Sequence, residues 1–230
     1  MDFTQMGFWV FFFIVYTGFA FVYKRLFARN LFLFLVSCFF YYKTSGLFVM
    51  LLLFSTVTDF YFGRQIDRSE NEGRRKLFVT LSVTLNLLVL SYFKYAYFFT
   101  DSYNTIFHTD HKVFNYLAYW GNGFRDKGYF SVDEIVLPVG ISFYTFQTIS
   151  YTVDIYRRKL KSLDSILDFG LYVTFFPQLV AGPIVRAEEF VPQILRPTQI
   201  TQADFNKATY FIFKGLIKKM LFANFIAKAI

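Results

Sequence analysis

The segment MGFWVFFFIVYTGFAFVY, residues 6–23, contains no charged residue and is followed directly by Lys24 and Arg25. A bilayer whose hydrocarbon core is about 30 Å thick needs roughly 20 apolar residues for one spanning helix. Trp9 and Tyr23 stand near the ends of this segment, where aromatic side chains anchor a helix at the membrane interface. The segment therefore predicts a transmembrane helix.

Further apolar stretches follow along the chain. Residues 31–58 are too many for one upright helix and contain the turn-like sequence KTSG at residues 43–46, so we expect two helices there. After a polar connection at residues 64–76, residues 77–93 form a fourth charge-free stretch. At 55% hydrophobic and 17% charged residues, the chain of 230 residues has more apolar surface than one soluble domain needs. We expect an all-α fold, a polytopic transmembrane helical bundle.

The net charge of +8 is spread over short clusters of Lys and Arg between the apolar stretches. This pattern is a topology signal and does not indicate a nucleic-acid partner, which would require one basic face. Membrane lipid is the expected solvent and headgroup partner. Placing the connections around Arg25 and Arg74 in the cytoplasm puts residues 101–134 outside as an extracytoplasmic loop, and it leaves Lys43 outside as a minor violation.

Two later apolar stretches, residues 137–153 and 169–185, contain helix-breaking and polar residues: Pro138, Gly140, Gln147, Gly170, Pro177, Gln178, Gly182 and Pro183. Broken backbone at membrane depth is tolerated only where protein buries it or where it lines a wet cavity. Basic residues stand on both sides of the second stretch, so we expect it to enter and leave by the cytoplasmic face as a re-entrant element. About five full spans accompany it.

Gln147 and Gln178 are candidate site residues, because an amide without partners in lipid is costly. They either line a substrate cavity or make structural hydrogen bonds. Asp154 is followed by Arg157 and Arg158, a spacing that predicts an ion pair at a helix end.

Metal and cofactor sites are not expected. Cys38 is the single cysteine, which excludes an internal disulfide and a Cys-rich metal site. His108 and His111 are expected to face water. Near the C-terminus, residues 201–204 form a capping box for an amphipathic helix whose Lys207, Lys214 and Lys218 oppose apolar side chains.

The two broken stretches also carry a family resemblance. LPVGISFYTFQ at residues 137–147, SYTVDIYR at residues 150–157, YVTFFPQLVAGPIVR at residues 172–186 and FVPQ at residues 190–193 occur in this order. Their order and spacing resemble the alginate O-acetyltransferase branch of the membrane-bound O-acyltransferase (MBOAT) family. Weaker similarity at residues 91–95 and 215–219 extends it over most of the chain.

The resemblance implies an enzyme of the bacterial inner membrane that passes an acyl group, usually acetyl, from a cytoplasmic donor to an acceptor hydroxyl outside. The donor would be acetyl-CoA or an acyl carrier, the acceptor a polysaccharide such as alginate, and other subunits of an exopolysaccharide acetylation complex are expected partners. Substrate binding would fall to Gln147, Gln178 and Arg186, with Arg186 meeting the anionic donor or anchoring at lipid headgroups.

One departure from the family concerns catalysis. The presumed catalytic histidine of the family lies C-terminal to the region matched here, and His108 and His111 do not occupy its position, so no catalytic residue is assigned. We expect residues 1–230 to be the N-terminal part of one MBOAT-like membrane domain and to be inactive alone. The alternatives are a non-catalytic membrane scaffold or a transporter component of a cell-surface polysaccharide system, although a transporter predicts symmetry between halves, which the sequence lacks.

Overall fold

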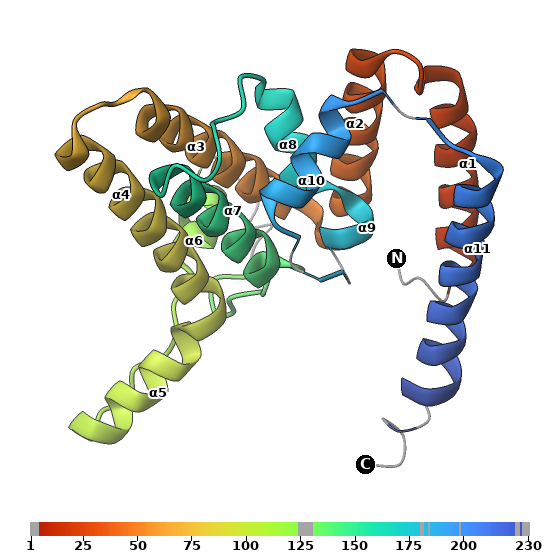
Figure 1. Ribbon diagram of the computed structural model, residues 1–230. Coiled ribbons are helices and arrows are strands. Elements are labelled where there is room, and N and C mark those ends of the chain that lie inside the picture. Colours follow the sequence, from red (N-terminus) through yellow and green to blue (C-terminus); the bar gives the residue numbers. More distant parts are fainter. Residues whose placement is uncertain are drawn as a thin grey trace.

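The computed structural model describes residues 5–123, 131–179, 182–183, 185–197, 199–223 and 226. Within these residues all regular secondary structure is helical, which confirms the all-α prediction (Figure 1). The helices are α1 Met6–Val22, α2 Leu26–Ser45, α3 Val49–Arg68, α4 Glu72–Leu90, α5 Ala96–Phe107, α6 Tyr116–Gly123, α7 Ile141–Tyr156, α8 Ile166–Thr174, α9 Phe176–Leu179, α10 Ala187–Leu195 and α11 Gln202–Ile217.

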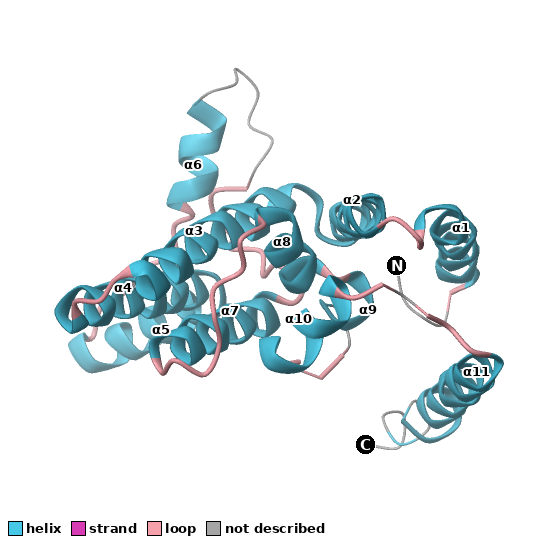
Figure 2. Cartoon of the chain, turned by 45° about the horizontal axis from the view of Figure 1, so that its top comes forward, coloured by secondary structure: helices cyan, strands magenta, loops and turns pink. Residues whose placement is uncertain are grey.

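The tightest packing joins α3, α4 and α7 to one another and α2 to α8. In Figures 1 and 2, α1 lies at one edge of this group, and Figure 2 shows α6 projecting from it. Gly63 of α3 lies against Tyr151 of α7, where a Cβ atom would come within 2.9 Å of the ring. Small residues let helix backbones approach closely, as is common in membrane proteins.

The predicted turn at residues 43–46 is confirmed. Helix α2 ends at Ser45, and Gly46 has a φ of +60°, a backbone conformation that favours glycine. A 3₁₀ turn at Gly46–Phe48 then leads into α3.

The connection predicted at residues 64–76 is much shorter in the structure, where only residues 69–71 are not helical. Helix α3 continues to Arg68 and α4 begins at Glu72, capped by the Asn71 side chain, which accepts from the Arg74 N–H at 3.1 Å. A helix can continue past its apolar part into charged residues, because their long side chains keep the charged groups in water. The sequence pattern therefore marked the apolar span and not the helix.

The predicted loop at residues 101–134 also needs correction. A π-helical segment at Ser91–Tyr95 joins α4 to α5, and α5 continues to Phe107. Helix α6 then occupies part of the remainder, and residues 124–130 lie outside the described part. Helical runs at Leu26–Arg68 and Glu72–Phe107 are long and apolar enough to cross a membrane, whereas the apolar helices Met6–Val22 and Ile166–Leu179 are shorter.

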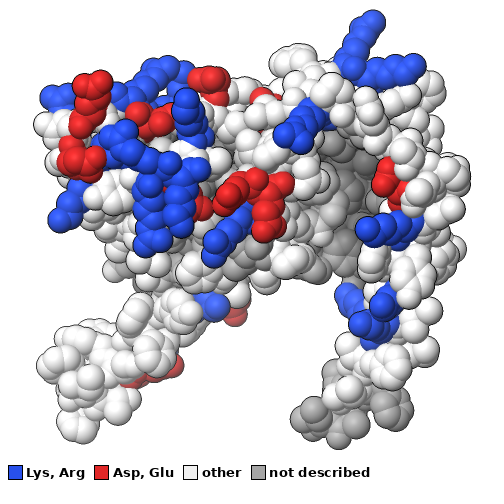
Figure 3. All heavy atoms as spheres, viewed as in Figure 1, with Lys and Arg blue, Asp and Glu red and all other residues white. Residues whose placement is uncertain are grey.

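Charged side chains gather at one end of the molecule, here called the charged end, where the α1–α2, α3–α4 and α7–α8 connections lie (Figure 3). The predicted pair between Asp154 and the following arginines is wrong in this region. Arg158 takes a positive φ of 59° as α7 ends, and its Nη2 lies 3.6 Å from Glu72 Oε1 of α4. The turn thus carries the arginine toward a neighbouring helix.

A buried polar network joins α3, α4 and α7 away from the charged end. Asp59 is 1% exposed and accepts from Ser82 Oγ at 2.7 Å and from Asn86 Nδ2 at 2.9 Å. Asn86 Oδ1 accepts from Thr148 Oγ1 at 3.2 Å, and Ser82 Oγ lies 3.2 Å from Thr152 Oγ1. The network ties the three helices together through groups that lipid could not satisfy.

Arg75 locks the same three helices at the charged end. Its guanidinium is buried and donates to the carbonyls of Ile66 in α3 and of Ile155 and Tyr156 in α7, at 3.2, 3.3 and 2.6 Å. Carbonyls in the last turn of a helix have no partner within it, so a cation there is favourable. Glu72 accepts from the same guanidinium at 2.6 Å.

The predicted capping box of the last helix is confirmed. Thr201 Oγ1 accepts from the Asp204 N–H at 3.2 Å, and Asp204 Oδ2 accepts from the Thr201 N–H at 3.0 Å. Helix α11 runs beside α1 in Figure 1 but is largely exposed, and Figure 2 shows the separation between them.

We predict that Arg75→Met lowers the free energy of unfolding by about 3 kcal/mol, because it removes the buried side-chain donor of the Ile66 and Tyr156 carbonyls. Thermal unfolding in detergent measures this. The neighbouring Arg74→Met is the control, since Arg74 is exposed and its side chain caps no helix. Equal loss in both variants would contradict the capping role.

We also predict that the start of α11 loosens at acid pH. Hydrogen bonds from the Thr201 hydroxyl and N–H hold the pKa of Asp204 below its usual range. A lowered folded-state pKa gives stabilisation that is present above the unfolded pKa near 3.9 and is lost as pH falls through the folded value. Hydrogen exchange of residues 202–206 should show this loss. Thr201→Ala should weaken the pH dependence, because only the backbone N–H of residue 201 then donates to Asp204, whereas Thr209→Ala should retain it in full.

Candidate functional site

Helices α8, α9 and α10 form a hairpin whose two ends meet at Asn30 of α2. The Asn30 amide donates to Asp168 Oδ1, in the first turn of α8, at 2.7 Å. It also donates to the Ile194 carbonyl, in the last turn of α10, at 3.1 Å. The segment therefore leaves and returns at the same end of the molecule.

Arg29 reinforces this junction. It is 3% exposed, donates to Asn30 Oδ1 from Nε at 3.0 Å, and donates to the Arg196 carbonyl from Nη1 at 2.8 Å. Its Nη2 also donates to the Ile194 carbonyl. A residue in the first turn of α2 thus caps the end of α10.

The hairpin turns at a helix break between α8 and α9. Phe175 has a ψ of 108°, which ends α8 at Thr174. Pro177 has no N–H with which to continue the α8 ladder. The Phe176 N–H donates instead to Ser37 Oγ of α2 at 3.2 Å. The second broken stretch of the sequence is therefore interrupted, as predicted.

Gln147 and Gln178 meet at the carbonyl that this break releases. Both are buried, and their Nε2 atoms donate to the Tyr172 carbonyl at 2.8 and 2.9 Å. The sequence left open whether these amides line a substrate cavity or make structural hydrogen bonds. The contacts seen here are structural hydrogen bonds. A role in substrate binding stays a prediction for both residues.

The first broken stretch is less interrupted than expected, because Pro138 and Gly140 precede α7 and the helix is continuous from Ile141. Gly140 has a φ of 76°, and a Cβ atom there would lie 2.6 Å from the Leu179 carbonyl oxygen. Glycine at this position thus lets the start of α7 touch the end of α9.

Three buried hydroxyls lie on the helices that meet at the hairpin tip, defined as residues 174–179. Tyr144 and Thr145 belong to α7 and Thr174 to the end of α8, and none of their hydroxyls has a hydrogen-bond partner in the described structure. A buried hydroxyl without a partner costs about 1–3 kcal/mol. Such groups require an explanation, of which a bound polar group is one.

Arg186 does not lie beside the two glutamines at the Tyr172 carbonyl. It precedes α10 at the end opposite Asn30, its side chain is exposed, and its carbonyl accepts from the Glu189 N–H at 3.1 Å. Its neighbour Val185 accepts from the Tyr172 hydroxyl at 3.2 Å. The backbone beside Arg186 is therefore attached to the residue that both glutamines contact.

The two histidines lie far along the chain from these residues. His108 ends α5 with a φ of 52°, and the His111 N–H donates to Asn104 Oδ1 at 2.9 Å. No group of three or more His, Cys, Asp or Glu residues that could hold a metal occurs in the described part of the chain. Cys38 is a free, partly buried thiol.

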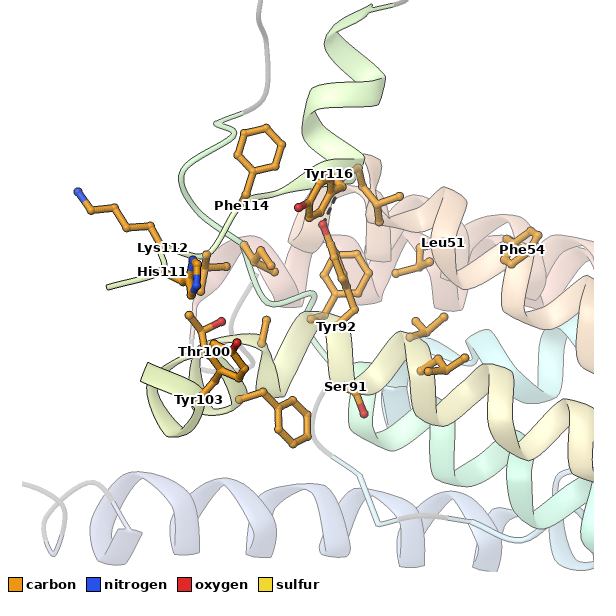
Figure 4. Close-up of a pocket in the computed structure, with 18 residues that line it drawn as sticks. Leu51, Phe54, Ser91, Tyr92, Thr100, Tyr103, His111, Lys112, Phe114 and Tyr116 are labelled. Atoms are coloured by element: carbon orange, nitrogen blue, oxygen red, sulfur yellow. Dashed lines mark hydrogen bonds between the residues drawn. The ribbon is translucent and has the colours of Figure 1, made fainter. Parts of the chain in front are cut away.

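A separate groove of about 1150 Å³ lies where α4 passes into α5 (Figure 4). Its walls come from α3, α4, the π-helical segment, α5, the segment 111–117 and Ile135. The groove was not predicted from the sequence, because its lining combines residues of two expected helices, among them Leu51 and Leu88, with residues 111–117 of the expected loop.

We predict a coupled effect of the two glutamines on stability. Gln147→Leu and Gln178→Leu should each cost about 1 kcal/mol, because one amide still serves the Tyr172 carbonyl. The double variant should cost more than the sum, since that carbonyl then has no donor. Thermal unfolding of the two single variants and the double variant measures this double-mutant cycle, and Gln193→Leu, at an exposed position, is the control. Strict additivity would contradict a shared acceptor.

Comparison with known proteins finds relatives whose names include O-acetylase or O-acetyltransferase. The chain is 34% identical over 200 residues, 86% of its length, to the probable alginate O-acetylase AlgI of Pseudomonas aeruginosa. It is 34% identical over 203 residues to the protein of the same name in Azotobacter vinelandii. Over 221 residues it is 30% identical to the peptidoglycan O-acetyltransferase of Helicobacter pylori.

These matches cover 35%, 37% and 38% of the relatives, so the chain spans little more than a third of their length. No family model matches the chain, and no solved structure does. The resemblance predicted from the motifs at residues 137–193 is confirmed by these relatives. The chain is a homologue of alginate O-acetylases and of a peptidoglycan O-acetyltransferase, in keeping with the alginate O-acetyltransferase branch of the MBOAT family.

Proposed function

We propose that this chain forms part of a membrane O-acetyltransferase that transfers acetyl groups from a cytoplasmic donor to hydroxyls of an extracytoplasmic polysaccharide. The observation that carries the proposal is 30–34% identity, over about 86% of the chain, with proteins named as O-acetylases and an O-acetyltransferase. Two acceptor classes follow from those names, alginate and peptidoglycan, and both are polymers with free hydroxyls.

The proposed setting is the bacterial inner membrane, which a multi-pass bundle crosses with its charged end in the cytoplasm. The α8–α10 hairpin is then re-entrant. Both of its ends bond to Asn30 at the charged end, and its broken turn is satisfied by Ser37, Gln147 and Gln178. This arrangement meets the requirement that irregular backbone at membrane depth be buried in protein.

The proposed donor site is the hairpin tip and the hydroxyls beside it. Transfer of an acetyl group from a thioester forms a bond between the acceptor oxygen and the carbonyl carbon and breaks the carbon–sulfur bond, releasing a thiol. Hydroxyl donors such as those of Tyr144 and Thr174 suit the acyl carbonyl oxygen, on which negative charge develops. The tip residues Thr174–Leu179 include no His, Asp or Glu, so the acceptor proton passes to a general base elsewhere.

Arg186 is the proposed contact for the anionic part of the donor. Its exposed guanidinium makes no ion pair within the described residues, and guanidinium pairs well with phosphate. The acyl donor would be acetyl-CoA or an acyl carrier, both of which bear phosphate.

We predict acetyl transfer from labelled acetyl-CoA to polysaccharide in membranes that express this chain extended by the genomic sequence downstream, and none with residues 1–230 alone. In the extended protein, Arg186→Gln should raise the donor KM about tenfold with little change in kcat, because it removes ground-state binding. Lys159→Gln, an exposed residue of the α7–α8 connection, is the control. Absence of transfer with every acceptor tried, despite correct membrane insertion, would favour a scaffold.

A further inference from the structure

We propose that the groove where α4 passes into α5 binds one anionic glycerophospholipid, with its acyl chains against α3 and α4 and its headgroup at Lys112. The residues that line it include apolar side chains of both helices, among them Leu51, Phe54 and Leu88. Phe54 and Leu88 are 56% and 62% exposed, so the apolar end of the groove opens toward the surface of the spanning helices.

The opposite end of the groove is polar and basic. Thr100, Tyr103, His111 and Lys112 stand there, and Figure 4 shows the lysine extending outward at the rim. Among the described residues, the lining includes no acidic side chain and Lys112 makes no ion pair. An apolar floor with one basic end matches an amphiphile that carries negative charge at one end.

Hydrogen bonds fix the wall of the groove that carries Lys112. The π-helical segment puts Tyr92 in position to donate to Asn115 Oδ1 at 2.9 Å. The Asn104 side chain accepts from the His111 N–H at 2.9 Å and donates to the His111 carbonyl at 2.8 Å. These bonds fix the segment that carries Lys112 onto the π-helical segment and α5. A preformed site loses less entropy on binding than a flexible one.

The apolar lining and the lysine together favour an anionic lipid as the occupant. An apolar groove that opens toward the lipid is filled by acyl chains unless protein covers it. Contact of its apolar side chains with acyl chains has a lower free energy than contact with water. A single lysine near the surface is worth about fivefold in affinity for an anionic headgroup. The site should therefore prefer phosphatidylglycerol to phosphatidylcholine by that factor.

Quenching by brominated lipids in nanodiscs tests the proposal, both in the 230-residue chain and in the extended protein. Trp9 and Trp120 are first replaced by Phe, and Leu88→Trp then places one fluorophore in the groove. Half-maximal quenching should need about fivefold less brominated phosphatidylglycerol than brominated phosphatidylcholine. Leu81→Trp, on an exposed face of α4 outside the groove, should show no preference.

Two charge variants locate the headgroup. Lys112→Glu should remove the preference at the groove fluorophore, whereas Lys43→Glu, an exposed lysine at the end of α2, should leave it intact. Equal quenching by both lipids in the unaltered groove would overturn the proposal. Loss of quenching by both lipids would overturn it as well, because protein would then cover the groove.

Discussion

A carbonyl released by a helix break must find a donor inside the protein when lipid surrounds the helices, and the α8–α10 hairpin is arranged around one such carbonyl, that of Tyr172. The break at Phe175 releases this carbonyl and redirects the Phe176 N–H to Ser37. Gln147 and Gln178 then supply two donors to the same oxygen. One local irregularity therefore fixes how α2, α7 and α9 meet.

The same requirement governs the charged end, where it divides the basic residues into two kinds. Arg29 and Arg75 are buried, and their guanidinium groups donate to carbonyls at the ends of α10, α3 and α7. Arg74 and Lys159 are exposed and free to meet water or headgroups. Basic clusters that read only as a topology signal thus also contain the caps that hold helix ends together, and net charge alone does not distinguish the two.

Sequence patterns predicted the features that depend on neighbouring residues. The Gly46 turn, the capping box at Thr201 and the break near Pro177 follow from backbone preferences and so were predicted correctly. The extent of α3 to Arg68 was missed, since charged residues end an apolar pattern before they end a helix. The partners of Gln147, Arg158 and Asn30 were also missed, because they come from distant segments. The Asp59 network did leave a signal: Ser82 and Asn86, like Thr148 and Thr152, are four residues apart and share a helix face.

Helix α7 connects the two polar regions of the fold. Thr148 and Thr152 face α4 and the Asp59 network, while Gln147 reaches the Tyr172 carbonyl of α8. Individual hydrogen bonds between membrane helices are worth only about 0.6 kcal/mol on average, so they contribute little net stability. Their directions nevertheless exclude most rotations and shifts of α7, because each such movement would leave several buried groups unpaired. The polar residues of α7 therefore determine where the hairpin tip lies more than how strongly the helices associate.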